Sequence, residues 1–180
     1  IVFSLPPQLL VDLIPIEGGL STTYRESINN LPKPSGALVF YGALNRSDLP
    51  VNCSAHIQIF DDEFGSLFIS ISMENDQRAP AGMATLIASI FVDVDQWSNL
   101  DSQSYTSKKD IVAKQIITII NNQLDLPETC WAHKELSTPR SFERWTGRPG
   151  GIVGGLGQHP SQFGPFGLSS RTPLEGLWLC

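Results

Sequence analysis

Charged residues are scarce in this chain, and their scarcity limits the partners that it can have. Asp, Glu, Lys and Arg make up 17% of its 180 residues, below the roughly 25% of an average globular protein. The net charge is −6, and no basic run exceeds the pair Lys108-Lys109. Nucleic acid is not an expected partner, because binding to phosphates needs clustered basic side chains. Either another domain or an apolar ligand covers part of this surface, or the surface is solvated with few charges.

Cysteine and histidine are too few and too scattered to predict a metal centre. The sequence holds three of each, at Cys53, Cys130, Cys180, His56, His133 and His159. The cysteines are odd in number and far apart, which predicts neither a disulfide framework nor metal ligands. Buried thiols in a reducing compartment are the expected state. The histidines share no metal-ligand spacing, so they are expected on a strand face or in solvent.

Several motifs that would reveal a membrane span or a catalytic site are missing. No apolar run approaches the ~20 residues of a transmembrane helix, and no Gly-x-Ser-x-Gly elbow occurs. The glycines between 150 and 157 fail the dinucleotide pattern, because Pro160 stands where the third glycine of Gly155-Leu156-Gly157 would be. A turn-rich lid, or backbone passing close to a flat ligand, is the expected role of this cluster.

Both ends of the sequence have the character of strands. The chain starts at Ile1 with no initiator Met, and it stops in the apolar run 177–180. A buried strand rarely makes a natural terminus, because its backbone groups need cover. We therefore expect a piece of a longer protein.

Hydrophobic periodicity predicts strands and helices up to about residue 137. Strands are expected over 1–4, 36–44, 55–60, 66–72, 83–92 and 129–136. The third and fourth of these alternate polar and apolar residues and predict a hairpin, and 83–92, apolar on both faces, predicts a central strand. Helices are expected over 7–14, 24–31 and, most clearly, 105–124. The order predicts an α+β fold with a mixed, largely antiparallel sheet and helices on one face.

The remaining segment, 138–180, is rich in glycine, proline and aromatic residues and shows little periodicity. Irregular segments of this length are usually functional. Its aromatic side chains either pack in a core or line an apolar ligand surface. Flanking glycine and proline favour the ligand surface for Phe163 and Phe166.

Short motifs follow one another closely in this segment. They are Thr138-Pro139-Arg140, Phe142, Thr146-Gly147-Arg148, 150–158, Phe163-Gly164-Pro165-Phe166-Gly167, Arg171-Thr172-Pro173 and Gly176-Leu177-Trp178-Leu179-Cys180. In this order they resemble the C-terminal region of FAD-dependent carotenoid desaturases and isomerases, the phytoene-desaturase-like members of the amine-oxidase-like flavoproteins. The residues Pro50-Val51-Asn52-Cys53 and Arg78-Ala79-Pro80-Ala81-Gly82 are most similar to the carotenoid 3′,4′-desaturase branch known from cyanobacteria.

The resemblance implies the substrate domain of an FAD-dependent oxidoreductase. Residues 1–14 would be a strand and helix bordering the FAD domain, 15–173 the substrate-binding domain, and 174–180 the final strand. That strand would lead into a Gly-Asp-Ser motif that contacts the flavin, and Cys180 would adjoin it. The motif and the dinucleotide fingerprint are both absent. We therefore expect FAD in the full-length protein, no tight FAD binding by this segment, and no certain cofactor-binding residue within it.

The implied activity is desaturation of a carotenoid C–C bond, with the isolated segment inactive. A carotenoid cis–trans isomerase, a retinol-saturase-like enzyme and a non-catalytic carotenoid-, lipid- or partner-binding module remain alternatives. Phe142, Trp145, Phe163 and Phe166 are expected to line an apolar channel, and no catalytic residue can be named. The expected partners are a carotenoid or other polyene and the FAD domain of the same polypeptide. The expected location is the cytoplasm, with peripheral membrane association left open because carotenoids partition into lipid.

Overall fold

The chain folds into two compact units. The computed structural model describes residues 1–74 and 76–180. One unit combines residues 1–35 with 152–180, and the other is the continuous stretch 36–151. We call them the helical unit and the sheet unit.

The sheet unit is built on five antiparallel strands in the order β3-β4-β5-β2-β6. Its strands and helices are β2 (Gly36–Asn45), β3 (His56–Asp61), β4 (Gly65–Ile71), β5 (Met83–Val92), α3 (Asp95–Ser98), α4 (Ser102–Leu124), β6 (Trp131–Ser137) and α5 (Pro139–Thr146). Short 3₁₀ turns occupy Arg46–Asp48, Glu128–Cys130 and Pro149–Gly151. The predicted α+β class, the hairpin of β3 with β4 and the central place of β5 are confirmed.

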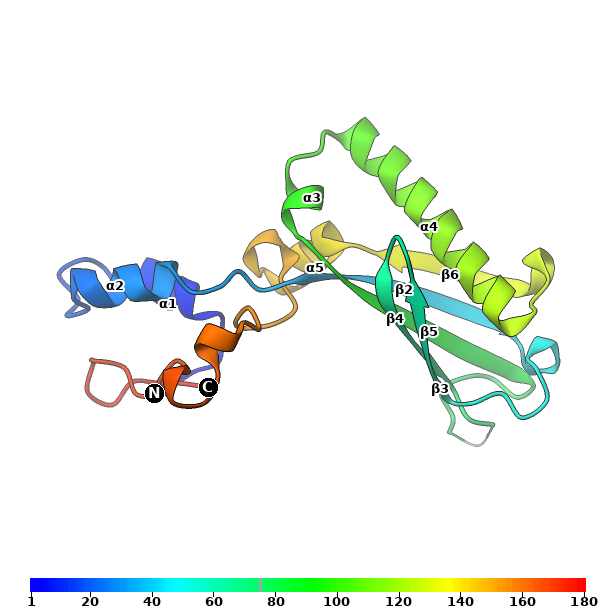
Figure 1. The fold of residues 1–180 in the computed structure, drawn as a ribbon, viewed down its shortest axis with the longest axis horizontal. Helices are drawn as coiled ribbons and strands as arrows, with labels where there is room; N and C mark the ends of the chain where they lie inside the picture. The colour runs from blue at the N-terminus through cyan, green and yellow to red at the C-terminus, as the bar shows by residue number, and fades with distance from the viewer. Residues whose placement is uncertain (75) are drawn as a thin grey trace. The chain divides into compact units, whose positions relative to one another are not determined.

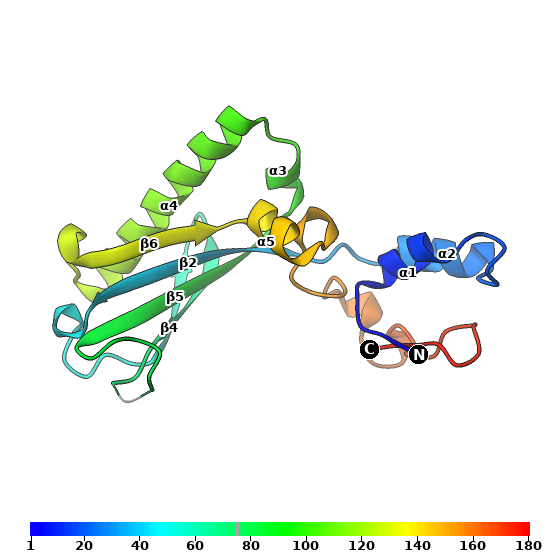
Figure 2. The ribbon, with the colours of Figure 1, turned by 180° about the vertical axis from the view of Figure 1, so that it is seen from behind.

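The long helix α4 covers one face of this sheet (Figures 1 and 2). Alternate residues of β2 and β5, such as Phe40 and Leu86, are buried beneath it. The helix contributes Ile116 and Ile120, which fall on one stripe because they are four residues apart. We call this side of the sheet the covered face, and the main core of the unit lies between it and α4.

Polar residues set the beginning of α4 and fix its far end to the sheet. Asp101 caps the helix by accepting hydrogen bonds from the backbone N–H groups of Gln103 and Ser104, both at 2.9 Å. Near the C-terminus of α4, Asn121 Oδ1 accepts a hydrogen bond from the indole N–H of Trp131 on β6 at 3.0 Å. The Trp131 ring meets the Phe40 ring edge to face, with centroids 5.3 Å apart.

The prediction of an irregular segment from residue 138 onward is wrong for α5. Pro139 occupies the first helical turn, and the Thr138 backbone N–H donates to Ser141 Oγ at 3.2 Å. Gly147 ends the helix in a left-handed conformation, with φ of 67°. These are strong end signals, but the helix has only eight residues. That length is too short for a clear apolar stripe.

The helical unit holds two helices and one small pair of strands. These are α1 (Pro7–Leu13), α2 (Thr22–Asn29), β1 (Val2–Phe3) and β7 (Trp178–Leu179), with 3₁₀ turns over Pro160–Gln162 and Gly164–Phe166. The strands pair in parallel, Val2 with Trp178 and Phe3 with Leu179. Arg25 joins the helices by donating to the carbonyl oxygens of Val11 and Ile14, each at 2.8 Å. The expected strand at 1–4 and helices at 7–14 and 24–31 are present within a few residues.

Candidate functional site

The face of the sheet opposite α4 carries large apolar side chains that no other element of the sheet unit covers among the described residues. Phe60 is 81% exposed, Phe91 74% and Phe68 42%. Tyr41 and Ile87 are also exposed on this side. We call this surface the open face. Isolated exposed apolar residues are ordinary, but a contiguous group of them commonly marks an interaction site.

The strand register explains why these residues share a face. Residues directly opposite each other in an antiparallel pair project to the same side of the sheet. One such row runs across all five strands through His56, Ser70, Ile87, Tyr41 and Glu135. The next row runs through Gln58, Phe68, Ser89, Val39 and Ser137.

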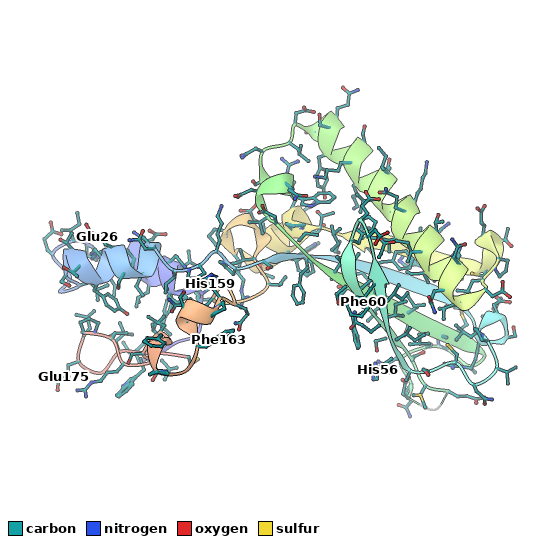
Figure 3. All side chains as sticks on the ribbon, viewed as in Figure 1. Glu26, His56, Phe60, His159, Phe163 and Glu175 are labelled. Atoms are coloured by element: carbon teal, nitrogen blue, oxygen red, sulfur yellow. The ribbon has the colours of Figure 1, made fainter. Side chains whose placement is uncertain are left out.

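The open face changes character along the strands. Phe60 and Phe91 lie two residues beyond Gln58 and Ser89, at the end where β5 stops, and with Phe68 they form the aromatic end. Towards the opposite end lie His56, Glu135 and His133, which we call the polar end. Figure 3 labels His56 and Phe60 at the two ends of β3.

The polar end contains a loose ion pair and a stacked ring. His133 Nε2 lies 3.8 Å from Glu135 Oε2, and both side chains are more than half exposed. A pair as exposed as this contributes little to stability. The His56 ring stacks on Phe68 with centroids 5.6 Å apart. These groups therefore remain available to donate and accept hydrogen bonds.

The described residues offer no arrangement for nucleophilic or metal chemistry on this face. Within residues 1–74 and 76–180, no group of three His, Cys, Asp or Glu side chains could hold a metal ion. Burial raises the pKa of the Cys53 and Cys130 thiols, which keeps them protonated at neutral pH. Cys180 is exposed, contrary to the expectation of buried thiols. The open face can bind and orient an apolar molecule, but it supplies no evident reacting group.

The four aromatic residues predicted for a ligand channel fall into two pairs. Phe142 and Trp145 lie three positions apart on α5 in the sheet unit. Phe142 is half-buried, while Trp145 is 80% exposed and has the Arg144 guanidinium 5.6 Å from its ring centre. Phe163 precedes a 3₁₀ turn of the helical unit and Phe166 is its last residue, and both are exposed. Figure 3 labels Phe163. Their role as a channel stays a prediction.

The described residues do not fit FAD on their own. A dinucleotide site needs a strand, a glycine-rich turn and a helix whose N-terminus meets the pyrophosphate. Around 150–157 the described backbone forms a 3₁₀ turn and bends, with no such helix after it. Gly151 and Gly157 instead pack tightly: added Cβ atoms would meet the backbone carbonyls of Pro139 and Pro32, respectively. These two glycines therefore serve close backbone packing.

A cavity of about 290 Å³ lies on the other side of the sheet. It opens between the sheet and the N-terminal half of α4, with Trp97 and Val112 in its wall. The Lys108 ammonium lies over the Trp97 ring, 4.7 Å from its centre, and donates to the Gln96 carbonyl at 2.9 Å. The volume is at the lower limit of ligand pockets, roughly 300–1,000 Å³. It is too small for a dinucleotide or a long polyene.

Sequence reasoning missed the open face as a site. In β3 and β4 the apolar residues of the covered face were recognised by their alternation. A second apolar surface is indicated by Phe60, Phe68 and Phe91, because they occupy the alternate strand positions that lie between the covered-face residues. Large aromatic residues at positions that ought to be polar indicate a face that meets something other than water.

No protein-family model matches the chain. Among curated proteins it is similar to prolycopene isomerases of plants. It is 27% identical to that of Daucus carota over 141 residues, which cover 72% of this chain and 23% of the relative. For prolycopene isomerase 1 of an Oncidium hybrid the identity is 29%, covering 72% and 24%, and for that of Arabidopsis thaliana 27%, covering 72% and 23%.

The similarity to prolycopene isomerases is therefore distant but spans most of the chain. The chain covers about a quarter of the length of these relatives. Their names describe them as chloroplastic. Among the described residues, no helix combines the length and the apolar character needed to cross a membrane.

Proposed function

We propose that this chain is the substrate-binding part of an FAD-dependent carotenoid cis–trans isomerase. The observation that carries the proposal is the similarity to prolycopene isomerases over 72% of the chain. The open face agrees with it, because a long polyene needs an extended apolar surface rather than a compact pocket. An isomerase is favoured over the desaturase of the initial expectation, since the relatives named above are isomerases.

In this proposal the chain's own residues hold the polyene and keep water away from it. Phe60, Phe68 and Phe91 are suited to pack against conjugated carbon chains, since aromatic faces bury large apolar area. Phe142, Trp145, Phe163 and Phe166 are proposed to help form an apolar channel for the polyene. No residue of the chain is assigned a proton-transfer step.

FAD, when bound by other parts of the same polypeptide, would supply electron chemistry at the polyene that leaves no net change in the oxidation state of the substrate. The proposed division keeps residues 1–14 and 174–180 as the segments bordering the FAD domain and 15–173 as the substrate-binding domain. The parallel pairing of β1 with β7 supports it, because the two bordering segments lie side by side. The isolated segment is predicted to retain little FAD after gel filtration and to be inactive.

The test supplies the full-length protein with FAD and a poly-cis carotenoid such as prolycopene, followed by product analysis. We expect products of unchanged mass with altered double-bond geometry. Loss of two hydrogens with a longer chromophore would instead assign the desaturase activity. Binding without turnover would indicate a non-catalytic carotenoid-binding protein, and neither binding nor turnover would contradict the proposal.

A desaturase remains the second candidate because of two loop segments. Pro50–Cys53 and Arg78–Gly82 resemble the 3′,4′-desaturase branch more than the isomerases. Replacing both segments with isomerase sequence in the full-length protein tests this. A desaturase would lose activity or change the bond attacked, whereas an isomerase would be little affected.

The proposed channel residues need a test of their own. Alanine at Phe142, Trp145, Phe163 and Phe166 together is expected to lower polyene affinity and turnover of the full-length protein. The matched control is alanine at Ile16 and Ile111, which are also exposed and lie outside the segments proposed to contact substrate. Unchanged affinity and turnover in the quadruple variant would remove these residues from the site.

The proposed location is the cytoplasm with peripheral association to membranes, where carotenoids dissolve. Fractionation of cells expressing the full-length protein, with and without a salt wash, tests it. Recovery from an organelle, as the names of the relatives would suggest, would contradict the cytoplasmic part.

A further inference from the structure

The two outer strands of the five-stranded sheet, β3 and β6, differ in how well they resist pairing with another chain. Strand β6 carries three consecutive ionisable residues, 133–135, and its register with β2 is shifted by a bulge. Charges and bulges of this kind protect an edge. Strand β3 pairs with β4 in an unbroken register, contains no lysine, arginine or proline, and has its one acidic residue at its last position. Among the described strands only β4 pairs with it.

The backbone groups of alternate β3 residues point away from β4. The Ile71 N–H donates to the Ala55 carbonyl at 2.8 Å, in the same register that pairs His56 with Ser70. Antiparallel strands bond through alternate residues, so 55, 57, 59 and 61 face β4. The N–H and C=O groups of 56, 58 and 60 therefore lie along the outer side of the strand, where they offer a template for one more strand.

These outward groups are complementary to a second copy of the same strand. An antiparallel pair with its two-fold axis at Gln58 sets Gln58 opposite its own copy and His56 opposite Phe60. Outward groups then meet outward groups, whereas a shift of one residue would set them against groups that face β4. In this register Asp61 falls opposite Ala55, so no like charges lie directly across from each other.

The side chains agree with this two-fold register. On the open face, Phe60 is 81% exposed and would lie opposite His56 of the second copy, whose ring stacks on Phe68. On the other face, Ile57 would lie opposite Ile59, and both are only half-buried. Aromatic and β-branched pairs across neighbouring strands stabilise a sheet. The pairing would therefore cover apolar area that is now in contact with water.

We propose that β3 is the interface of a two-fold homodimer, in which two five-stranded sheets join edge to edge through residues 56–60. A second copy is the occupant because hydrogen-bonding direction, side-chain pairing and charge all match β3 to itself in one register. A head-to-tail joint would set β3 against the charged and bulged β6, and it would propagate into an open filament. The inference goes beyond the proposed function and does not depend on it.

The experiment measures the mass of the FAD-loaded full-length protein by sedimentation over a range of concentrations. One strand pair makes a small interface, so a dimer with a dissociation constant of about 1–10 μM is expected. Gln58→Lys and Gln58→Glu should each weaken self-association about fivefold or more, because like charges then face each other across the axis. A mixture of the two variants should dimerise at least as tightly as wild type, which only a residue on the axis predicts.

Ser66→Lys is the matched control. Ser66 is also exposed on the open face, and its Oγ accepts a hydrogen bond from Gln58 Nε2 at 2.6 Å, so this bond is lost in every one of these variants. Ser66 lies on β4, one strand away from the edge and opposite Phe60 rather than Gln58. Its substitution is expected to leave the dissociation constant unchanged.

A covalent link tests the register directly. Residues opposite each other in a hydrogen-bonded pair have Cα atoms about 5.5 Å apart, which suits a disulfide. Mild oxidation of Gln58→Cys should give a covalent dimer on a non-reducing gel. Ser66→Cys should not, and the unsubstituted protein gives the background of its native cysteines.

Three outcomes would overturn the inference. A protein that stays monomeric at about 100 μM with its Gln58→Cys thiol unlinked would mean that another strand of the same polypeptide, or water, occupies the edge. A dimer that both charge variants leave intact would have its interface elsewhere. Two weakened variants that fail to restore each other would exclude the two-fold axis. Mass and cross-linking do not depend on turnover, so the polyene proposal stands or falls by its own test.

Discussion

The two faces of the five-stranded sheet come from the same strands but differ in how their apolar residues are used. On the covered face, Phe40 and Leu86 lie beneath α4 and are almost fully buried. On the open face, Phe60 and Phe91 are 81% and 74% exposed. Burial of apolar area stabilises the fold by about 25 cal/mol per Å². The covered face therefore carries the stability of the unit, whereas the open face keeps apolar area for a partner or ligand.

The largest effect is expected from the covered face. Ile120→Ala should destabilise the protein by about 3 kcal/mol, because it removes three carbon atoms from a fully buried site and leaves a cavity. Urea denaturation measures the change. Ile111→Ala on the exposed side of the same helix is the control and should cost less than about 1 kcal/mol. Equal losses for both would contradict the assignment of the faces.

A second, smaller loss is expected where Trp131 packs on β2. The Cβ added in Gly42→Ala would lie 2.9 Å from a Phe40 ring carbon and closer still to the Trp131 ring. Overpacking of this kind costs about 1–3 kcal/mol. Gly155→Ala is the control, because an added Cβ there meets nothing within 4 Å. Thermal unfolding that gives the same midpoint for both variants would argue against this packing.

Substitutions on the open face should weaken ligand binding while changing the free energy of unfolding very little. Phe91→Ala is expected to change the unfolding free energy by less than about 0.5 kcal/mol, because the ring is mostly in solvent. The same variant should weaken polyene binding about tenfold, since a stacking surface is lost. Calorimetry and ligand titration on one preparation test both halves. A large loss of stability would mean that the ring is buried in the native protein.

The smallest effect on stability is expected at the N-terminus of α4, the helix that packs on the covered face of the sheet. Hydrogen bonds from the Ser104 and Gln103 groups to the Asp101 carboxylate lower its pKa. Because the folded pKa is depressed, the stabilisation is present above the unfolded value of about 3.9 and is lost as pH falls through the folded pKa. Asp101→Asn should remove this pH dependence. NMR titration of the side chain checks the direction, and a pKa above the ordinary value would contradict the cap.

The sequence predicted those helices and strands that have a clear hydrophobic period and missed the features that lack one. Periodicity placed β5 at its observed limits, 83–92, and found α4 apart from its first turn, which depends on the Asp101 cap. Helix α5 was missed because eight residues carry no clear stripe, although Thr138-Pro139 marks its start. The open face could not be recognised from alternation alone. Whether Phe91 lies in a second core or in solvent depends on which elements cover β5, and the residues of the strand do not specify this.

The parallel pairing of β1 with β7 also has a practical consequence for protein engineering. The Trp178 N–H donates to the Ile1 carbonyl at 2.9 Å, and the Cys180 N–H donates to the Phe3 carbonyl at 3.1 Å. The stretch of chain between β1 and β7 therefore begins and ends at two neighbouring, hydrogen-bonded strands. A chimera that exchanges the residues between β1 and β7 for those of a related protein needs to match the backbone only at these two strands. Such an exchange would show directly which ligand preferences are transferred with the exchanged residues and which are not.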